Sequence, residues 1–432
     1  MRYKSAGKEL FSNNRKRLLK EMKGNSVAVV NANDIMPTNS DGTMRFRQNS
    51  DLYYLSGVDQ EETILVLCPD FPDKKFREVL FLRETSELIA TWEGHKLTKE
   101  EAREATGIDT VLWMSEFNRV FNTMMLMGDV EHVYLNTNDH YRAEVSIESR
   151  EARFVKWCKD KFPLHRYERL ALIMHRLRSI KSKTEIEMMQ QACDITEKAF
   201  RRVLKFVKPG VLEYEIEAEF AHEFLRNGSR GFAYEPIIAS GANSCVLHYI
   251  ENSRPCNDGD ILLLDVGAEY GNYNADMTRT IPVNGKYTKR QKDVYNAVLH
   301  VQREAMKMLE PGVLYFEYHK EVQKITESEL IKLKLLDKTD VKNQSKEKPL
   351  FQKYFMHGTS HQLGLDVHDV GSMYHKMQVG QVWTVEPGIY IREEGLGVRI
   401  ETNVVIQKNG LLDLMKNIPV EVQEIEEIMN GK

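Results

Sequence analysis

Short apolar runs separated by polar segments make up the first part of the chain. The runs at residues 26–32, 62–69, 77–83 and 131–137 predict strands, because about four to eight consecutive apolar or β-branched residues suit a buried strand. The charged segment at residues 97–107 predicts a short helix that ends at Gly107, a residue type favoured just after a helix. We therefore expect a small α/β domain, with helices packed on a sheet, over residues 1–175.

The pattern changes after residue 175. Ser182 and Glu185 have the spacing of a capping box, and the apolar residues that follow recur with helical period as far as Val207, where we expect them to be core. Further helices are predicted at residues 212–228, 288–309 and 315–334. Strand-like segments lie at residues 235–240, 262–283, 382–391 and 398–406. This mixture predicts an α+β domain over residues 176–432.

Composition narrows the class of protein. A length of 432 residues suggests about two or three domains. The formal net charge of −4 argues against a nucleic-acid-binding protein, which usually has a basic surplus. Five cysteines without a CxxC pair fit a reducing compartment. The charged start lacks the apolar core of a signal peptide, and no apolar stretch approaches a membrane span. We expect a cytoplasmic protein with no nucleic-acid or membrane partner.

Residues 331–353 are rich in lysine, with seven lysines and three acidic residues. A solvated helix end followed by a surface loop explains this composition, and we favour that interpretation over a docking loop.

Five residues in the second half carry candidate metal chemistry. They are Asp265, Asp276, His361, Glu386 and Glu401, each in its own short motif: LLLDVG, NADMTRT, HGTSHQLGLDVHDVG, WTVEPGIY and GVRIETNVV. Four carboxylates in one pocket would repel one another, and two divalent cations would hold all four as anions. One nitrogen and many oxygens suit a metal such as Mn²⁺ better than a structural, sulfur-bound zinc.

Each carboxylate taken alone has a plainer interpretation. Asp265 could be a turn former, although an antiparallel hairpin could bring it onto one face with Asp276. Glu386 ends an apolar strand, where a carboxylate is costly unless it is paired or bound to metal. Arg399 and Glu401 alternate on one strand face, which an ion pair would also explain.

The histidines are ambiguous by spacing. His357, His361 and His368 share one motif, and their separation does not identify the metal ligand. His248 lies in an apolar segment, where a core histidine with satisfied hydrogen bonds is the commoner explanation.

Together the five motifs, in this order, resemble the pita-bread metallopeptidases, a family that includes methionine aminopeptidase, prolidase and X-prolyl aminopeptidase. The resemblance is greatest to bacterial-type aminopeptidase P, and it extends to FRQNSDLYYLSG at residues 46–57 and TWEGHKLT at residues 91–98. HGTSHQLGLDVHDVG is highly specific, whereas DVG or EPG alone would be weak. The resemblance implies an N-terminal domain of the aminopeptidase P type and a pita-bread catalytic domain.

The resemblance also implies roles for individual residues. Asp265 and Glu386 each bind one metal ion, Asp276 and Glu401 bridge two, and His361 is the histidine ligand. His357, His368 and His248 become groups around the metal that contact substrate. His357 and Tyr390 are candidates for the wall of a proline pocket, and Arg399 orients the carboxylates.

The implied activity is release of the first residue from peptides with proline in second position. A hydroxide that bridges the two metal ions would attack the carbonyl carbon before proline, since metal binding lowers the pKa of water from about 15.7 toward about 7. His248 and His368 would stabilise the tetrahedral intermediate. Glu386 would carry the proton to the proline nitrogen.

Trp92, in TWEGHKLT, aligns with a tryptophan that reaches a neighbouring subunit's active site in the family. This implies a homodimer or homotetramer, although a packed surface aromatic is the plainer interpretation.

Four alternatives share part of this pattern. Prolidase uses the same five ligands and cleaves Xaa-Pro dipeptides. Methionine aminopeptidase lacks an N-terminal domain of this size, and creatinase-like enzymes lack the full metal set. A non-catalytic pita-bread binding module typically loses metal ligands, whereas all five positions are present here.

Overall fold

The computed structural model describes Tyr3 and residues 6–431, and the chain divides into two compact units. The first comprises residues 6–178, and the second comprises residues 179–431 together with Tyr3. Each unit is described by itself.

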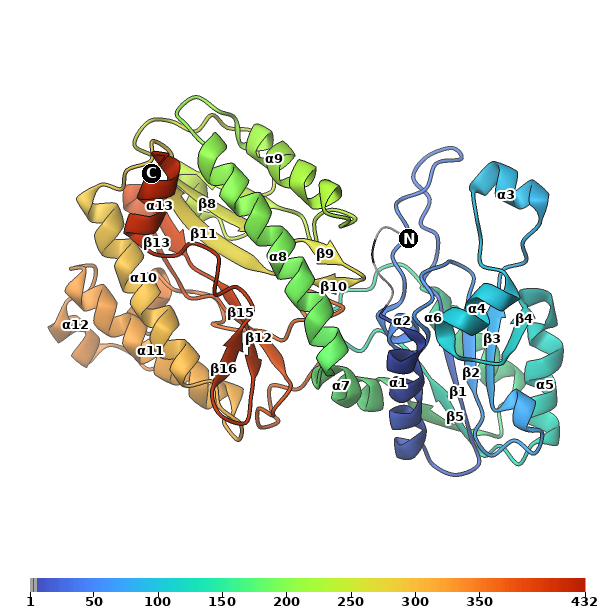
Figure 1. Cartoon of the computed structure of the whole chain (residues 1–432). Helices are drawn as coiled ribbons and strands as arrows, with labels where there is room; N and C mark the ends of the chain where they lie inside the picture. Colours follow the sequence, from blue (N-terminus) through green and yellow to red (C-terminus); the bar gives the residue numbers. More distant parts are fainter. Residues whose placement is uncertain (1–2, 4–5, 432) are drawn as a thin grey trace. The chain divides into compact units, whose positions relative to one another are not determined.

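The first unit is a six-stranded sheet with helices packed on it (Figure 1). The strand order is β4-β3-β2-β1-β5-β6, with antiparallel pairing of β2 to both β1 and β3 and parallel pairing elsewhere. The strands are β1 (Ser26–Asn31), β2 (Ile64–Leu67), β3 (Glu78–Leu82), β4 (Thr110–Trp113), β5 (His132–Leu135) and β6 (Arg166–Arg169). The helices are α1 (Lys8–Glu21), α2 (Ser50–Ser56), α3 (Glu87–Glu93), α4 (Lys99–Thr106), α5 (Phe117–Met127), α6 (Arg150–Lys161) and α7 (Ala171–Ser179), the last of which ends in the second unit.

The strands of this unit could be predicted from the sequence because their apolar residues form its buried core. Alternate residues of β1, such as Val27 and Val29, pack with the apolar faces of β2, β3 and α5 in one buried cluster. The four predicted strands and the helix ending at Gly107 are confirmed, and Gly107 adopts the left-handed conformation (φ 70°) that ends α4. β4 (TVLW) and β6 (RYER) were not predicted, and β6 consists mostly of charged residues.

The second unit combines long helices with several small antiparallel sheets. The helices are α8 (Lys183–Phe206), α9 (Glu213–Arg226), α10 (Lys289–Lys307), α11 (Tyr315–Lys332), α12 (Lys338–Asn343) and α13 (Val422–Met429). The strands are β7 (Ile237–Ser240), β8 (Ile261–Val266), β9 (Glu269–Tyr270), β10 (Tyr273–Asn274), β11 (Met277–Pro282), β12 (Val382–Val385), β13 (Gly388–Ile391), β14 (Leu396–Arg399), β15 (Thr402–Ile406) and β16 (Leu411–Asp413).

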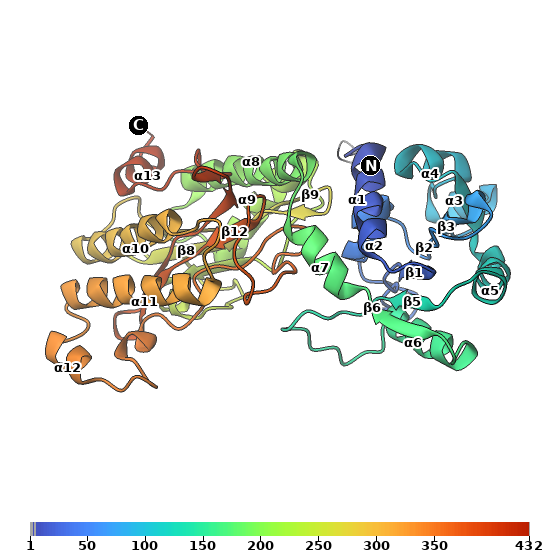
Figure 2. The same cartoon turned by 90° about the horizontal axis from the view of Figure 1, so that it is seen from below.

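Sheet order brings distant motifs together. The described sheets are β11-β8-β7, β12-β15-β16, β13-β14 and β10-β9. α8 and α9 lie side by side, as do α10 and α11, in both views (Figures 1 and 2).

The capping box at Ser182 and Glu185 begins α8 as predicted. The predicted α/β and α+β pair of domains is confirmed.

The lysine-rich segment differs from its prediction in one respect. It contains a short helix, α12, where a surface loop was expected. The Asp337 side chain accepts hydrogen bonds from the backbone N–H groups of Thr339 and Asp340, which caps the start of this helix.

No helix in the described part of the chain is both long and apolar enough to cross a membrane.

Candidate metal centre

The first two carboxylates come from a hairpin. β8 and β11 pair antiparallel, with Thr278 opposite Asp265, so Asp276 lies just before β11 and close to Asp265. This confirms that these strands form an antiparallel pair. Gly267, in the connection, has no room for a side chain, since a Cβ there would lie 1.8 Å from the carbonyl oxygen of Ala275.

The two glutamates lie at the end of a second ladder. Val385 of β12 pairs with Thr402 of β15, and Glu386 and Glu401 are the adjoining residues on the two strands. The Glu401 N–H donates to the carbonyl of Thr278, which ties this ladder to β11. Glu386 and Glu401 are therefore held close together by strand register, although they are 15 positions apart in the sequence.

His361 completes the cluster. Donor atoms of Asp276, His361 and Glu401 all lie within 4.8 Å of one another. His361 Nε2 is 3.4 Å from Asp276 Oδ2 and 3.6 Å from Glu386 Oε1. Its Nδ1 lies 3.0 Å from the carbonyl oxygen of Gln362, which accepts a hydrogen bond from the Nδ1–H group and leaves Nε2 on the side of the carboxylates.

Burial sets the electrostatics of the acidic groups. It raises the pKa of Asp265 against the opposing effect of Arg399, raises that of Glu386 to about 7, and raises that of Glu401 well above its ordinary value. Burial lowers the pKa of His361, but its contact with Asp276 and the nearby carboxylates raise it overall. Burial therefore disfavours the ionised forms of these carboxyl groups, and nearby positive charge favours them.

The donor set fits divalent cations. Glu401 is 2% exposed, and its Oε1 has no hydrogen-bond partner among the described residues, an arrangement that is costly unless a cation or water lies there. Four carboxylates and one imidazole match the ligands of hard to borderline metals.

A hydrogen-bonded chain runs beside this cluster. Arg399 Nη2 is 2.5 Å from Asp265 Oδ2, and its Nη1 donates to the Tyr390 hydroxyl at 2.8 Å. Tyr390 in turn lies 2.8 Å from His357 Nε2, and His357 Nδ1 lies 2.8 Å from the Gly358 carbonyl. The carbonyl accepts a hydrogen bond from the Nδ1–H group, so Nε2 accepts a hydrogen bond from the Tyr390 hydroxyl. Both ring nitrogens of His357 are thus engaged within the protein.

The other predicted residues occupy different positions. His368 is exposed, with its ring 4.4 Å from that of His361. His248 is exposed on the loop after β7. Trp92 lies in the first unit, on α3, and is 82% exposed.

Sequence reasoning missed Tyr234. Its hydroxyl is 2.6 Å from both Asp265 Oδ1 and Asp276 Oδ1, and no spacing signal pointed to it. Burial and these two carboxylates raise its pKa well above the ordinary value. It is therefore a neutral donor between two acidic groups.

Two further residues behind the carboxylates had a usable signal. Thr278 donates to Glu401 Oε2 at 2.8 Å, and Asn403 exchanges hydrogen bonds with the backbone of Asp276. Each lies two positions after a carboxylate on a strand, so the period of two along a strand places it on the same face.

Comparison with known proteins identifies the family. Metallopeptidase family M24 matches residues 187–408, and the aminopeptidase P N-terminal domain matches residues 11–134. The Xaa-Pro aminopeptidase of Escherichia coli (strain K12) is 35% identical over 97% of this chain and 97% of its own length. The chain belongs to metallopeptidase family M24.

Further similar proteins support the same family assignment. Human Xaa-Pro aminopeptidase 3 is 33% identical over 95% of this chain and 82% of its own length. The Pseudomonas aeruginosa aminopeptidase PepP superimposes with a TM-score of 0.89 at 30% identity, covering 100% of this chain and 99% of that one. A zinc-substituted E. coli aminopeptidase P in complex with product superimposes with a TM-score of 0.86 at 33% identity, covering 99% of each chain.

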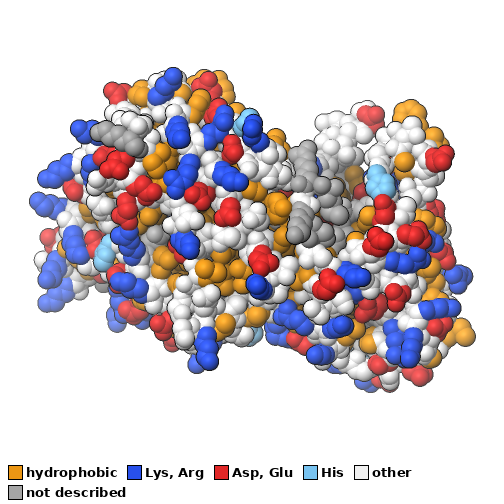
Figure 3. Space-filling view, in the orientation of Figure 1, with side chains coloured by type: hydrophobic (Ala, Val, Ile, Leu, Met, Phe, Trp, Pro, Cys, Tyr) orange, Lys and Arg blue, Asp and Glu red, His pale blue; other side chains and the backbone are white. Residues whose placement is uncertain are grey.

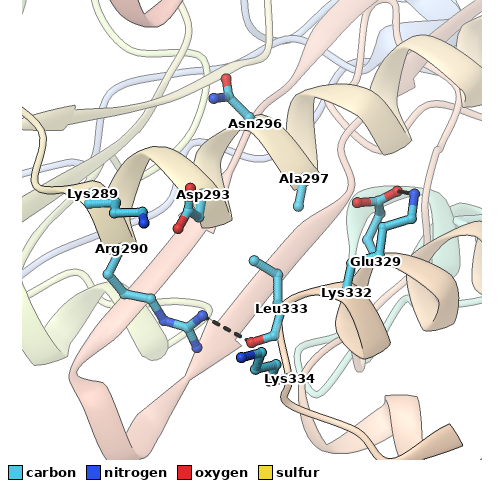
Figure 4. Close-up of a pocket in the computed structure, with 9 residues that line it drawn as sticks. All are labelled: Lys289, Arg290, Asp293, Asn296, Ala297, Glu329, Lys332, Leu333 and Lys334. Carbon is cyan, nitrogen blue, oxygen red and sulfur yellow. Dashed lines mark hydrogen bonds and ion pairs between the residues drawn. The ribbon is translucent and has the colours of Figure 1, made fainter.

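A cavity of the metallopeptidase lies outside the five motifs. It measures about 580 Å³ and is lined by residues of α10 and the end of α11 (Figure 4). Arg290 and Lys332 face it, but Arg290 pairs with Glu394 and Lys332 pairs with Glu329. Basic and acidic side chains are likewise intermingled over the face shown in Figure 3. The lining thus holds more basic than acidic side chains, but two of its basic groups are already paired.

Proposed function

We propose that this metallopeptidase is an aminopeptidase that releases the first residue from peptides whose second residue is proline. The observation that carries the proposal is the cluster of Asp276, His361 and Glu401 in a chain related over nearly its full length to Xaa-Pro aminopeptidases. Prolidase, which would cleave only Xaa-Pro dipeptides, is the less favoured alternative.

Asp265, Asp276, His361, Glu386 and Glu401 would hold two divalent ions, for which we propose Mn²⁺. When bound, such ions offset the four negative charges, polarise the peptide carbonyl and activate water for attack. The partnerless oxygen of Glu401 supports this ligand set.

The protein's own groups then handle the proton and the peptide. Glu386 takes a proton from the attacking water and delivers it to the proline nitrogen. His248 and His368, both exposed, donate hydrogen bonds to the oxygen of the reacting carbonyl as negative charge develops there. We assign these contacts to the two histidines because neither is buried in the core.

The substrate's proline meets the chain formed by Arg399, Tyr390 and His357. Tyr390 and Arg399 are buried and hydrogen-bonded to each other, so they give fixed support to the wall at the His357 ring, against which proline packs. Proline lacks an N–H, so an apolar ring face suits it better than a further acceptor.

The first unit supplies Trp92 to a second copy of the chain. None of the residues of α3 is buried, and Trp92 is 82% exposed. We propose a homodimer or homotetramer in which this side chain contacts a neighbouring site.

Five buried free thiols fit a reducing compartment, and we propose the cytoplasm.

A two-substrate assay tests the activity. The Mn²⁺-loaded protein is incubated with Arg-Pro-Pro and with Gly-Pro, and release of the first residue is followed. Cleavage of the tripeptide is expected, whereas cleavage of the dipeptide alone would establish prolidase. Cleavage of neither at full metal occupancy would overturn the proposal.

The proton-transfer role is tested with Glu386→Gln, which keeps the shape and one oxygen of the side chain. We expect turnover to fall by at least about 100-fold, a usual size for loss of a general acid–base. Metal content is measured alongside, and near-normal turnover with metal bound would show that another group moves the proton.

A further inference from the structure

Glu213, the first residue of α9, is a buried carboxylate outside the metal centre. Its exposed fraction is 0%. Oε1 accepts from the backbone N–H of Ser240 at 2.8 Å, the Ser240 hydroxyl at 2.7 Å and Asn243 Nδ2 at 3.3 Å. Oε2 accepts from the Tyr249 hydroxyl at 2.7 Å and the backbone N–H of Arg254 at 2.9 Å. An acceptor-only carboxylate at a helix N-terminus suits five converging donors.

All five donors belong to one segment, residues 240–254, which carries His248. This segment leaves β7 through a 3₁₀ turn at Gly241–Cys245 and then has no regular structure up to residue 253. Its backbone is therefore fixed by side-chain contacts rather than by a strand ladder. Glu213 reaches both ends of the segment, at Ser240 and Arg254, and also the residue next to His248.

The same segment is joined to the proposed proline wall. Cys245 and Tyr249 pack in one buried cluster with Tyr390. The Gly397 N–H donates to the Ser244 hydroxyl at 2.8 Å, and a Cβ at Gly397 would lie 2.1 Å from the Ser244 carbonyl oxygen. A shift of this segment would therefore displace His248 relative to β13 and β14.

His248 lies in the neighbourhood of His357. Burial is the main cause that lowers the pKa of His357 to about 3, and Arg399, His319 and His248 add smaller contributions. His248 is exposed, so the backbone segment that carries it has a large part in setting its position.

We propose that Glu213 is a positioning residue for His248, whose buried carboxylate clamps the 240–254 segment and so holds the imidazole against the reacting peptide. This rests on the proposed function for the role of His248, but the clamp itself rests on the five hydrogen bonds.

The sharpest variant is Glu213→Gln, which keeps the size of the side chain but replaces one acceptor oxygen with an NH₂ group. This NH₂ group is itself a donor, so it cannot accept hydrogen bonds from the N–H and O–H groups that face it. Buried N–H or O–H groups would therefore lose their hydrogen-bond partner. Glu219→Gln on the same helix is the matched control, because Glu219 pairs with Arg202 in a partly exposed contact.

We expect Glu213→Gln to lower kcat on Arg-Pro-Pro about 10- to 100-fold, the cost of a misplaced contacting group, with little change in KM or bound Mn²⁺. In a His248→Ala background the same change should cost nothing further. Glu219→Gln should behave as wild type. An unchanged kcat, or an equal loss in both backgrounds, would overturn the proposal.

Amide hydrogen exchange provides a readout independent of activity. Exchange should become faster at residues 241–254 in Glu213→Gln and remain unchanged in β8 and β11, and unchanged exchange in the segment would refute the clamp. If Glu213→Gln does not fold, Tyr249→Phe takes its place, because it removes a single hydrogen-bond donor to Glu213. The clamp then predicts that Tyr249→Phe lowers kcat in the wild-type background but not in the His248→Ala background. A wild-type protein that cleaves neither peptide would refute the proposed function, while exchange would still decide the clamp.

Discussion

At the scale of single residues, the main addition of the structure is a hydroxyl between two carboxylates. Tyr234 lies 2.6 Å from an oxygen of both Asp265 and Asp276. One hydroxyl carries one proton, so it donates to one carboxylate at a time and keeps the two groups in a fixed relation. Partners behind metal ligands commonly orient them and tune metal affinity.

Replacing Tyr234 with Phe should therefore weaken Mn²⁺ binding about 10- to 100-fold while the fold is kept. Titration calorimetry of the metal-free protein measures this. Tyr287→Phe is a matched control, because its hydroxyl also makes a buried hydrogen bond, to the Thr280 carbonyl, without touching a carboxylate. Equal affinity in wild type and Tyr234→Phe would show that the hydroxyl does not organise the ligands.

At the scale of elements, the connection from β8 to β11 decides where two ligands lie. Gly267 in this connection lies against the backbone of Ala275. A Cβ added at Gly267 would lie 1.8 Å from the Ala275 carbonyl oxygen. Backbone held by ladders on both sides cannot yield as a flexible side chain would.

Gly267→Ala should lower the free energy of unfolding by about 3 kcal/mol or more and reduce metal content, because the clash separates the strands that carry Asp265 and Asp276. Denaturant unfolding and metal analysis measure both effects. Gly24→Ala is the control, because no atom of the described residues, apart from its two chain neighbours, lies within 4 Å of the added Cβ. A Gly267→Ala protein with normal stability would mean that the connection can rearrange.

A second element, the start of α6, predicts a pH dependence of stability. Glu151 is 6% exposed and accepts hydrogen bonds from the backbone and side chain of Asn31 on β1. Burial raises its pKa from 4.5 to about 8 despite these bonds. Between these values the folded protein holds a proton that the unfolded chain has released, so the free energy of unfolding falls as pH rises through this window.

Glu151→Gln cannot titrate, so its stability relative to wild type should increase from pH 5 to pH 8. Melting temperatures at several pH values measure the difference between the two proteins. Glu148→Gln serves as control, because Glu148 forms a partly exposed ion pair with Lys156 and should leave the pH slope unchanged. A constant difference between Glu151→Gln and wild type would contradict the assignment.

At the scale of the whole molecule, α3 carries the side chain that we propose contacts a second copy of the chain. Figure 1 shows it on an arm that leaves the sheet of the first unit after β3, and none of its residues is buried. Arg83 pairs with both Glu61 and Glu93 at the base of this arm, so its exposed helix is held by charge rather than by a core.

Trp92→Ala should lower kcat/KM on Arg-Pro-Pro about tenfold without changing metal content, if the side chain completes a neighbour's site, since large aromatic contacts dominate interface energies. Sedimentation analysis gives the oligomeric state of the same samples. Leu88→Ala is the matched control, because Leu88 is 68% exposed on the same helix. Full activity of Trp92→Ala would return this side chain to the plainer interpretation of a surface aromatic.

Local sequence signals determined much of this protein. The apolar runs of β1, β2, β3 and β5 and the capping box of α8 depend on neighbouring residues, and the structure has them where the pattern predicted. The five motifs, through resemblance, indicated the family and its fold. Short polar strands such as β6 and the capped helix α12 were missed, because their stability comes from tertiary pairing or from one capping side chain.

Only the tertiary structure decided how the site is supported. Register places Glu386 beside Glu401, and folding of the second unit brings Tyr234 to Asp265 and Asp276 and Glu213 to the His248 segment. Periodicity describes which face a residue occupies within its own element, whereas these contacts join elements far apart in the chain. Buried acceptors need hydrogen-bond donors, and the tertiary fold determines which donors lie beside them. No local sequence pattern therefore predicts these contacts.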